Sequence, residues 1–205
     1  MDPSRIVRSG YDAIADPYLK ARLRGADQLP LLGDFMRAIP KGATVLDAGC
    51  GAGLPIAAHL ASSFRVLGVD FSMAQLRLAR ELVPTAHFIC QDLSVLGLTS
   101  DSVDGICCFY SIIHIPRVHH PHVLRDLYRI LRPNGAALLC LGAEDLPEEV
   151  GEYQGAPMFW SHFDANTYLE LLSNLGYVII RADLIPDPID ATGSHLFVLA
   201  RKPGA

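Results

Sequence analysis

Three aspartates, each at the end of a short apolar run, are the residues whose type and position best suit ligand binding. Asp47 lies in the stretch TVLDAGCGAG (44–53), Asp70 ends the run FRVLGVD, and Asp92 follows the run HFIC. A carboxylate accepts hydrogen bonds from hydroxyl and amino groups and attracts a positive centre, but it repels phosphate. The pattern therefore favours a ligand with hydroxyls and a positive charge over a pyrophosphate.

A glycine-rich turn carries Gly49, Gly51 and Gly53 at alternate positions. The apolar residues before it predict a buried strand, and Pro55 followed by AAHLA predicts a helix start. A strand, a glycine turn and a helix in this order bring backbone N–H groups and a helix N-terminus against a ligand. Cys50, inside the turn, is interpreted as a small residue beside that ligand rather than as a nucleophile.

An acidic residue followed by G-x-G-x-G closely resembles motif I of class I S-adenosylmethionine (SAM)-dependent methyltransferases and differs from the G-x-G-x-x-G dinucleotide fingerprint. The stretch R-x-L-R-P-N-G (129–135) is similar to the family's element before its fifth strand. The resemblance implies a seven-stranded, mostly parallel sheet of order 3-2-1-4-5-7-6, with the last strand antiparallel and helices on both faces. Alternating strand and helix patterns independently support a doubly wound α/β sheet. We expect one domain over residues 1–205.

The resemblance assigns Asp47, Gly49, Cys50 and Gly51 to the cofactor SAM. SAM has a sulfonium, an ammonium and a carboxylate group, and no phosphate.

The later acidic positions are expected to hold the nucleoside. Asp70 has the place where Rossmann-like folds bind ribose hydroxyls, and a loop or helix-capping aspartate is the alternative. Phe71 and Met73 are then expected to flank the adenine. By resemblance, Asp92 accepts from the adenine amino group and the Leu93 N–H donates to the ring; a turn aspartate is the other interpretation.

The N-terminal stretch YDAIADPYL (11–19) resembles the lid segment of many small-molecule methyltransferases. We expect residues 1–40 to form a helical lid, with Tyr11 against SAM and Tyr18 against the acceptor. Asp16 is expected to cap the second helix. The alternative is that both tyrosines simply pack on the domain.

The end of the predicted fourth strand lacks the N-P-P-Y-like residues of enzymes that methylate amines of DNA. Phe109 and Tyr110 stand there instead and are expected to border the cofactor. The following S-x-x-H segment resembles that of small-molecule methyltransferases. His114, its last residue, is a candidate general base, because its pKa class suits proton removal near neutrality; a capping or core histidine is the alternative.

The segment 142–163 breaks the alternation of strands and helices and is expected to be an irregular cap over the acceptor. Met158 and Trp160 are expected to line the acceptor site, with His162 as a second candidate base. Ordinary core packing beneath a loop is the alternative for the apolar residues of this segment.

The remaining histidines predict no metal site. His119, His120 and His122 resemble a metal cluster together with His114, but a helix start after Pro121 separates their directions and favours a solvated face. His59, His87 and His195 are expected to be structural. The five cysteines are interpreted as reduced thiols, mostly buried.

The composition of the chain limits the classes of binding partner that it suits. The formal charge of −5 and a pI of about 5.9 argue against nucleic acid or an anionic membrane as the main partner. No apolar run is long enough to span a membrane, and the first residues lack a signal-peptide core. We expect a cytoplasmic protein, monomeric or homodimeric.

The expected activity is transfer of a methyl group from SAM to a small-molecule acceptor, a metabolite or natural product. Attack by oxygen, nitrogen or carbon is not distinguished. Three alternatives remain: a SAM-fold enzyme for another reaction such as cyclisation, a non-catalytic SAM-binding subunit, and a nicotinamide-dependent oxidoreductase, which the glycine spacing disfavours.

Overall fold

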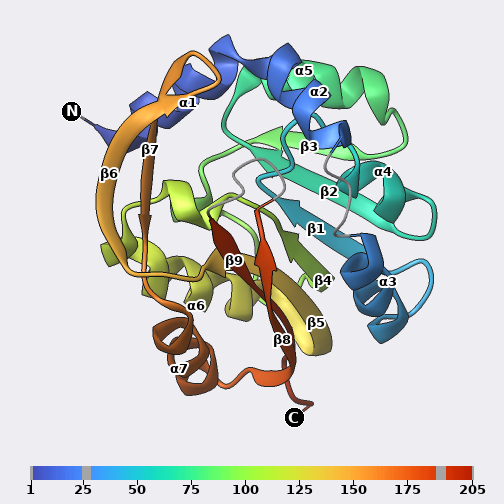
Figure 1. Cartoon of the computed structure of the whole chain (residues 1–205). Coiled ribbons are helices and arrows are strands. Elements are labelled where there is room, and N and C mark those ends of the chain that lie inside the picture. The colour runs from blue at the N-terminus through green and yellow to red at the C-terminus, as the bar shows by residue number, and fades with distance from the viewer. Residues whose placement is uncertain (1, 25–28, 188–192, 205) are drawn as a thin grey trace.

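A seven-stranded sheet in the order β3-β2-β1-β4-β5-β9-β8 forms the centre of the computed structural model, which describes residues 2–24, 29–187 and 193–204 (Figure 1). β1 to β5 run parallel, and β9 is antiparallel to β5 and β8. The predicted strand order and fold class are confirmed. The last two strands of the sheet are numbered β9 and β8 instead of 7 and 6, because two further strands outside this sheet come before them in the chain. The strands of this sheet are β1 (Thr44–Ala48), β2 (Arg65–Asp70), β3 (His87–Cys90), β4 (Val103–Cys108), β5 (Leu131–Gly142), β8 (Val178–Pro186) and β9 (Ser194–Arg201).

Helices cover both faces of the sheet because the parallel strands are apolar on both sides. On one face, α3 (Leu29–Ala38) and α4 (Ile56–Ala61) bury Phe35 and Leu60 against the strands. On the other face, α6 (His120–Ile130) and α7 (Ala165–Leu175) bury Leu127 and Leu172. α5 (Met73–Leu82) packs beside β2 and β3, and its N-cap Ser72 accepts from the Gln75 N–H.

A two-stranded hairpin replaces the irregular cap expected over residues 142–163, so that prediction was wrong in its secondary structure. β6 (Leu146–Tyr153) and β7 (Ala156–His162) pair antiparallel outside the main sheet. Gln154 and Gly155 both have positive φ and make the tight turn between them. The alternation of buried and exposed residues along β7 is the strand signal that the prolines and acids of this segment obscured.

The N-terminal helix α1 (Pro3–Ala13) lies against β7, at the far end of the hairpin (Figure 1). Gly10 permits this approach, since a Cβ there would lie 2.6 Å from the Pro157 carbonyl oxygen. Met158 is fully buried beneath α1, together with Val7 and Ile14. It therefore packs as a core residue of the lid and does not line the acceptor side as expected.

The second helix, α2 (Ala15–Arg24), begins one residue before Asp16. Asp16 thus lies in the first turn, where a carboxylate interacts favourably with the helix dipole, and the N-cap prediction was wrong. The R-P-N-G stretch also differs from expectation: it lies within β5, and Asn134 takes a positive φ of 65° at that irregular start of the strand.

Three short 3₁₀ helices complete the described elements: η1 (Leu93–Val95), η2 (Ile112–His114) and η3 (Arg117–His119). His120, expected on a solvated face, is instead completely buried at the start of α6. Its Nε2–H donates to the Ile115 carbonyl oxygen at 2.7 Å, and its Nδ1 lies 2.6 Å from the Tyr168 hydroxyl. These two partners explain how a polar ring is tolerated in the core.

The buried His120 predicts acid sensitivity. Burial lowers its pKa from 6.5 to about 4, so its stabilising contribution is complete above pH 6.5 and is lost as the pH falls toward 4. Urea unfolding at several pH values should show a free energy of unfolding that falls in acid. His120→Gln should remove roughly 1–3 kcal/mol of that fall. His59→Gln, at an exposed position, is the control; equal pH slopes in the two variants would contradict the assignment.

Candidate functional site

The glycine turn after β1 is shaped by a close contact with the segment after β4. Gly49 has φ of +77°, and a Cβ there would lie 1.7 Å from Oγ of Ser111. The Ser111 hydroxyl donates to the Ala48 carbonyl oxygen at 3.2 Å. Glycine is required at this position both by the backbone conformation and by this contact.

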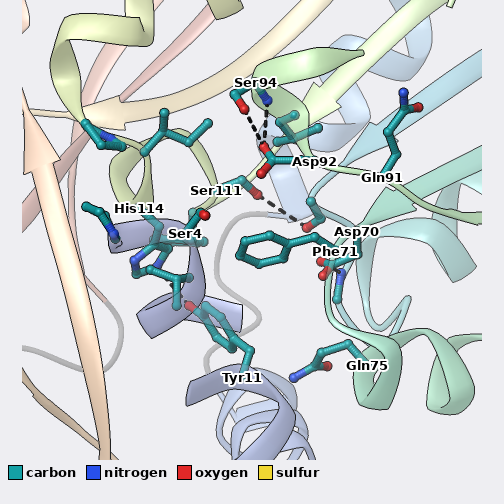
Figure 2. A pocket seen from close by; sticks show the side chains of 18 of the residues that line it. Ser4, Tyr11, Asp70, Phe71, Gln75, Gln91, Asp92, Ser94, Ser111 and His114 are labelled. Carbon is teal, nitrogen blue, oxygen red and sulfur yellow. Dashed lines mark hydrogen bonds between the residues drawn. The ribbon is translucent and has the colours of Figure 1, made fainter. Parts of the chain in front are cut away.

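Asp70, at the end of β2, is held by backbone donors. The Gly51 N–H donates to Oδ2 at 2.9 Å and the Ser72 N–H donates to Oδ1 at 2.8 Å. Burial raises the pKa of Asp70, and the N–H donors partly offset this rise. The carboxylate thus faces the cavity in a fixed orientation, with lone pairs left for hydroxyl groups (Figure 2).

Asp47 is a buried carboxylate with an unsatisfied oxygen. It is 2% exposed, and its Oδ2 has no hydrogen-bond partner. Burial, followed by the nearby Asp70, raises the pKa of Asp47 to about 7, while Arg22 lowers it. An orphaned carboxylate oxygen of this kind is satisfied by an incoming amino group or other positive centre.

Arg22 is a functional candidate that sequence reasoning missed. The residue is 7% exposed, and its guanidinium carbon lies 4.4 Å from the centre of the Tyr110 ring. Together with Asp47, Cys50 and the glycine turn, it lines a small crevice of about 30 Å³. No local motif marks this arginine, because its place depends on how α2 folds across the domain.

A cavity of about 290 Å³ runs from the glycine turn to the end of β3 (Figure 2). At its far end, Asp92 accepts from the Ser94 N–H and hydroxyl at 2.8 Å each. Gln75 also lines the cavity, and both polar atoms of its buried side chain lack partners. Gln75 was missed because one polar residue on a helix carries no sequence signal.

Most of the predicted cofactor residues line this cavity: Tyr11, Gly49, Gly51, Asp70, Phe71, Asp92, Leu93, Phe109 and Tyr110. Asp47 and Cys50 line the adjoining crevice instead. Met73 is 41% exposed on α5 and lines neither, so the structure gives no support to its adenine contact.

α1 covers the 290 Å³ cavity, and hydrogen bonds of two of its side chains hold it in place. Oδ1 of Asp12 accepts from the Ser72 hydroxyl at 2.6 Å and from the Ala74 N–H at 3.0 Å. The Tyr11 hydroxyl lies 2.8 Å from Nε2 of His114. The helix therefore occupies the position expected of a lid.

His114 uses both of its ring nitrogens. Nδ1 lies 2.7 Å from the Phe159 carbonyl oxygen, which can only accept, so Nδ1 carries the proton. Nε2 then accepts from the Tyr11 hydroxyl. Burial lowers the pKa of His114 to about 4, and the ring is neutral near pH 7. In this arrangement His114 joins α1 to β7 and has no nitrogen left to take a proton from an acceptor.

A second cavity, of about 520 Å³, lies between the hairpin, α2 and the start of β9. Tyr18, Trp160 and His162, which the sequence predicts to contact the acceptor, line this cavity. His195, expected to be structural, lines it as well, with Nε2 2.7 Å from Oδ2 of Asp187. The same four side chains border both cavities: Tyr11, Tyr18, Tyr110 and His114.

His162 is held by the backbone on two sides. Its Nδ1–H donates to the Glu144 carbonyl oxygen, 2.6 Å away, and the ring also hydrogen-bonds with the backbone of Phe163. Burial lowers the pKa of His162. Gly142 makes room for the ring, since a Cβ there would lie 2.2 Å from Nδ1. Within the described residues, no group of three His, Cys, Asp or Glu side chains is placed to hold a metal ion.

The comparisons with known proteins agree with this geometry. Residues 45–135 match the family described as a methyltransferase domain. A tRNA (carboxymethyluridine(34)-5-O)-methyltransferase of Xenopus tropicalis is 31% identical over 139 residues, 67% of this chain and 21% of that protein. The 2-phytyl-1,4-naphtoquinone methyltransferase of Thermosynechococcus vestitus is 31% identical over 107 residues, 49% of this chain and 47% of that protein. A solved SAM-dependent methyltransferase from Methanosarcina mazei has a TM-score of 0.74 at 18% identity, covering 86% of this chain and 98% of that one.

The family match and the fold agree on the class of the protein. Residues 45–135 match a methyltransferase domain, and the chain has the fold of a SAM-dependent methyltransferase, in agreement with the resemblance drawn from its sequence; SAM is the cofactor of these enzymes. The chain spans about half or less of the length of the two curated relatives. In the part that the structure describes, no helix combines the length and apolar character needed to cross a membrane.

Asp70→Ala should weaken binding of S-adenosylhomocysteine by roughly 1–3 kcal/mol, because ribose hydroxyls would lose a charged acceptor. Calorimetry on the folded variant measures this change. Glu81→Ala, at an exposed position on α5, should bind as the wild type does. Equal affinities of all three proteins would remove Asp70 from the cofactor site.

Proposed function

We propose that the protein transfers the methyl group of SAM to a small-molecule acceptor. The observation that carries this proposal is the meeting of two cavities at a shared wall made by Tyr11, Tyr18, Tyr110 and His114. One cavity has the donors and acceptors that a nucleoside needs, and the other is large enough for a second small molecule. Because the same side chains border both cavities, the two bound reactants would lie next to each other and could align for a displacement at carbon, which mainly requires this alignment.

The residues of the first cavity fit SAM. Asp70 and Asp92 suit the ribose hydroxyls and the adenine amino group, and Phe71 offers an aromatic face. In the adjoining crevice, the orphaned Oδ2 of Asp47 suits the ammonium, and the buried Arg22 suits the carboxylate. When bound, SAM would supply an electrophilic methyl group on a sulfonium.

The second cavity suits the acceptor. The hairpin contributes Trp160 and His162, and α2 contributes Tyr18. His162 lines this cavity and is a neutral imidazole that can take a proton from an acceptor, whereas the two hydrogen bonds of His114 to Tyr11 and Phe159 suit a positioning role. We therefore assign proton removal to His162 and closure of the lid to the pair of Tyr11 and His114.

Transfer RNA is the competing acceptor, because one relative is named for methylation of a tRNA uridine. Carboxylates of Glu144, Glu149 and Glu152 surround the second cavity here and would repel a phosphate backbone. Incubation with methyl-labelled SAM and either a small-molecule panel or total tRNA tests the proposal. Label should enter a small molecule with release of S-adenosylhomocysteine. Label in tRNA alone, or SAM binding without any transfer, would overturn it.

Arg22→Gln should weaken binding of S-adenosylhomocysteine at least tenfold, since its carboxylate would lose a buried charged donor. Binding of 5′-methylthioadenosine, which lacks the amino-acid end, should change little. Asp70→Ala should weaken both ligands, so calorimetry with the two ligands separates the two ends of the site. An Arg22→Gln protein that loses both ligands equally would point to general damage instead.

His162→Gln should lower kcat by roughly 10²–10⁴-fold if it removes a proton from the acceptor, with little change in SAM affinity. Wild-type kcat should fall in acid as His162 becomes protonated, and this acid limb should vanish in the variant. Tyr11→Phe should instead raise KM for SAM and leave the fall of kcat in acid unchanged, because it removes only the hydrogen bond between α1 and His114. A normal pH profile in His162→Gln would exclude His162 as the base.

A further inference from the structure

Five aromatic side chains form a closed ring in the second cavity, which we call the aromatic cage. Each ring contacts two others. The centroid distances around the circuit are 5.0 Å for Tyr11–Tyr18, 6.2 Å for Tyr18–Tyr153, 6.4 Å for Tyr153–Trp160, 6.0 Å for Trp160–His114 and 5.3 Å for His114–Tyr11. All five side chains line the 520 Å³ cavity.

The cage is assembled from distant parts of the chain. Tyr11 and Tyr18 come from α1 and α2, His114 from η2, and Tyr153 and Trp160 from the two strands of the hairpin. Tyr11, Tyr18 and His114 also border the cofactor cavity. The cage therefore lies in the second cavity, and three of its five rings form the side that adjoins the cofactor cavity. Figure 2 shows Tyr11 and His114, the two cage residues that hydrogen-bond to each other.

Carboxylates surround the cage. Glu144, Glu149 and Glu152 line the same cavity, and none of them forms an ion pair with the described residues. Asp145 and Asp187, which also line it, are paired with Arg117 at 2.6 Å and with His195 at 2.7 Å.

Positively charged side chains are few in the lining of the second cavity. Arg22 is the one lysine or arginine among the described residues that line this cavity. It stacks on Tyr110 and reaches the crevice of Asp47. His114, His162 and His195 are the other basic side chains among the described residues that line it. The cavity as a whole thus has an excess of negative charge.

From these observations we infer that the acceptor is a small amine whose cationic nitrogen sits in the aromatic cage. Aromatic faces attract a cation, and quaternary and methylated ammonium groups suit such cages best. The surrounding carboxylates add to the attraction, whereas a neutral aromatic acceptor gains nothing from them. This inference rests on the proposed function and narrows it to methylation at nitrogen.

The chemistry balances with groups already described. A protonated amine gives one proton to the imidazole of His162, which passes it to water. The nitrogen lone pair then forms the bond to the methyl carbon as the carbon–sulfur bond breaks and its electron pair stays on sulfur. The products are the N-methylated ammonium, which takes over the positive charge of the sulfonium, and S-adenosylhomocysteine.

Trp160 is the chain's only tryptophan, so its fluorescence reports directly on the cage. We would titrate the protein, saturated with S-adenosylhomocysteine, with choline and with its neutral isostere 3,3-dimethylbutan-1-ol. Saturation-transfer NMR on the methyl protons of both compounds gives an independent readout. Choline should bind about tenfold or more tightly than the isostere and quench Trp160 saturably.

Matched variants test the carboxylates. Glu149→Gln combined with Glu152→Gln should weaken choline several-fold, and Glu148→Gln should not, because Glu148 lies in β6 but does not line the cavity. If the wild type binds S-adenosylhomocysteine and the two probes bind equally, or neither binds, the amine acceptor is overturned while the methyltransferase proposal stands. If S-adenosylhomocysteine itself does not bind, the proposed function fails first.

Discussion

The buried imidazole of His114 is the interaction on which the two-cavity arrangement depends. Its Nδ1–H donates to the Phe159 carbonyl oxygen, and its Nε2 accepts from the Tyr11 hydroxyl. One neutral ring thus joins the lid helix α1, the segment after β4 and strand β7. Because burial keeps the ring uncharged near pH 7, both hydrogen bonds persist with a fixed tautomer. Loss of this ring would remove both hydrogen bonds and open the wall that the cavities share, while the direct packing of α1 on β7 would remain.

The sheet, and the residues that line the cavity at its edge, were predictable because their signals are local. Asp47, Asp70 and Asp92 each follow an apolar run, and parallel strands present their carboxyl ends at one edge. Gly49 needs both a positive φ and an absent side chain, so the turn is visible as a motif. The helix start near Pro121 was likewise visible, because proline is tolerated in the first turn of a helix.

The acceptor side was less predictable because contacts between distant segments create it. The hairpin was mistaken for irregular chain, since prolines and acids hide its alternation. Arg22 and Gln75 gain their meaning only where α2 and α5 meet the glycine turn and the cavity. His120 was assigned to the surface from its neighbours in sequence, whereas its partners Ile115 and Tyr168 come from tertiary packing.

Charge links the two halves of the site. The orphaned carboxylate of Asp47, whose pKa is raised to about 7, is a buried acceptor whose proper partner is a cation. The carboxylates beside the aromatic cage place a second excess of negative charge across the shared wall. In the proposed complex, a sulfonium would stand on one side and an ammonium on the other, and these negative fields would offset the mutual repulsion of the reactants. Transfer of the methyl group would discharge the sulfonium, whereas the ammonium of the cofactor beside Asp47 and the methylated ammonium in the cage would both keep their charges. Release of the spent cofactor would then depend on opening of α1 at the Tyr11–His114 contact.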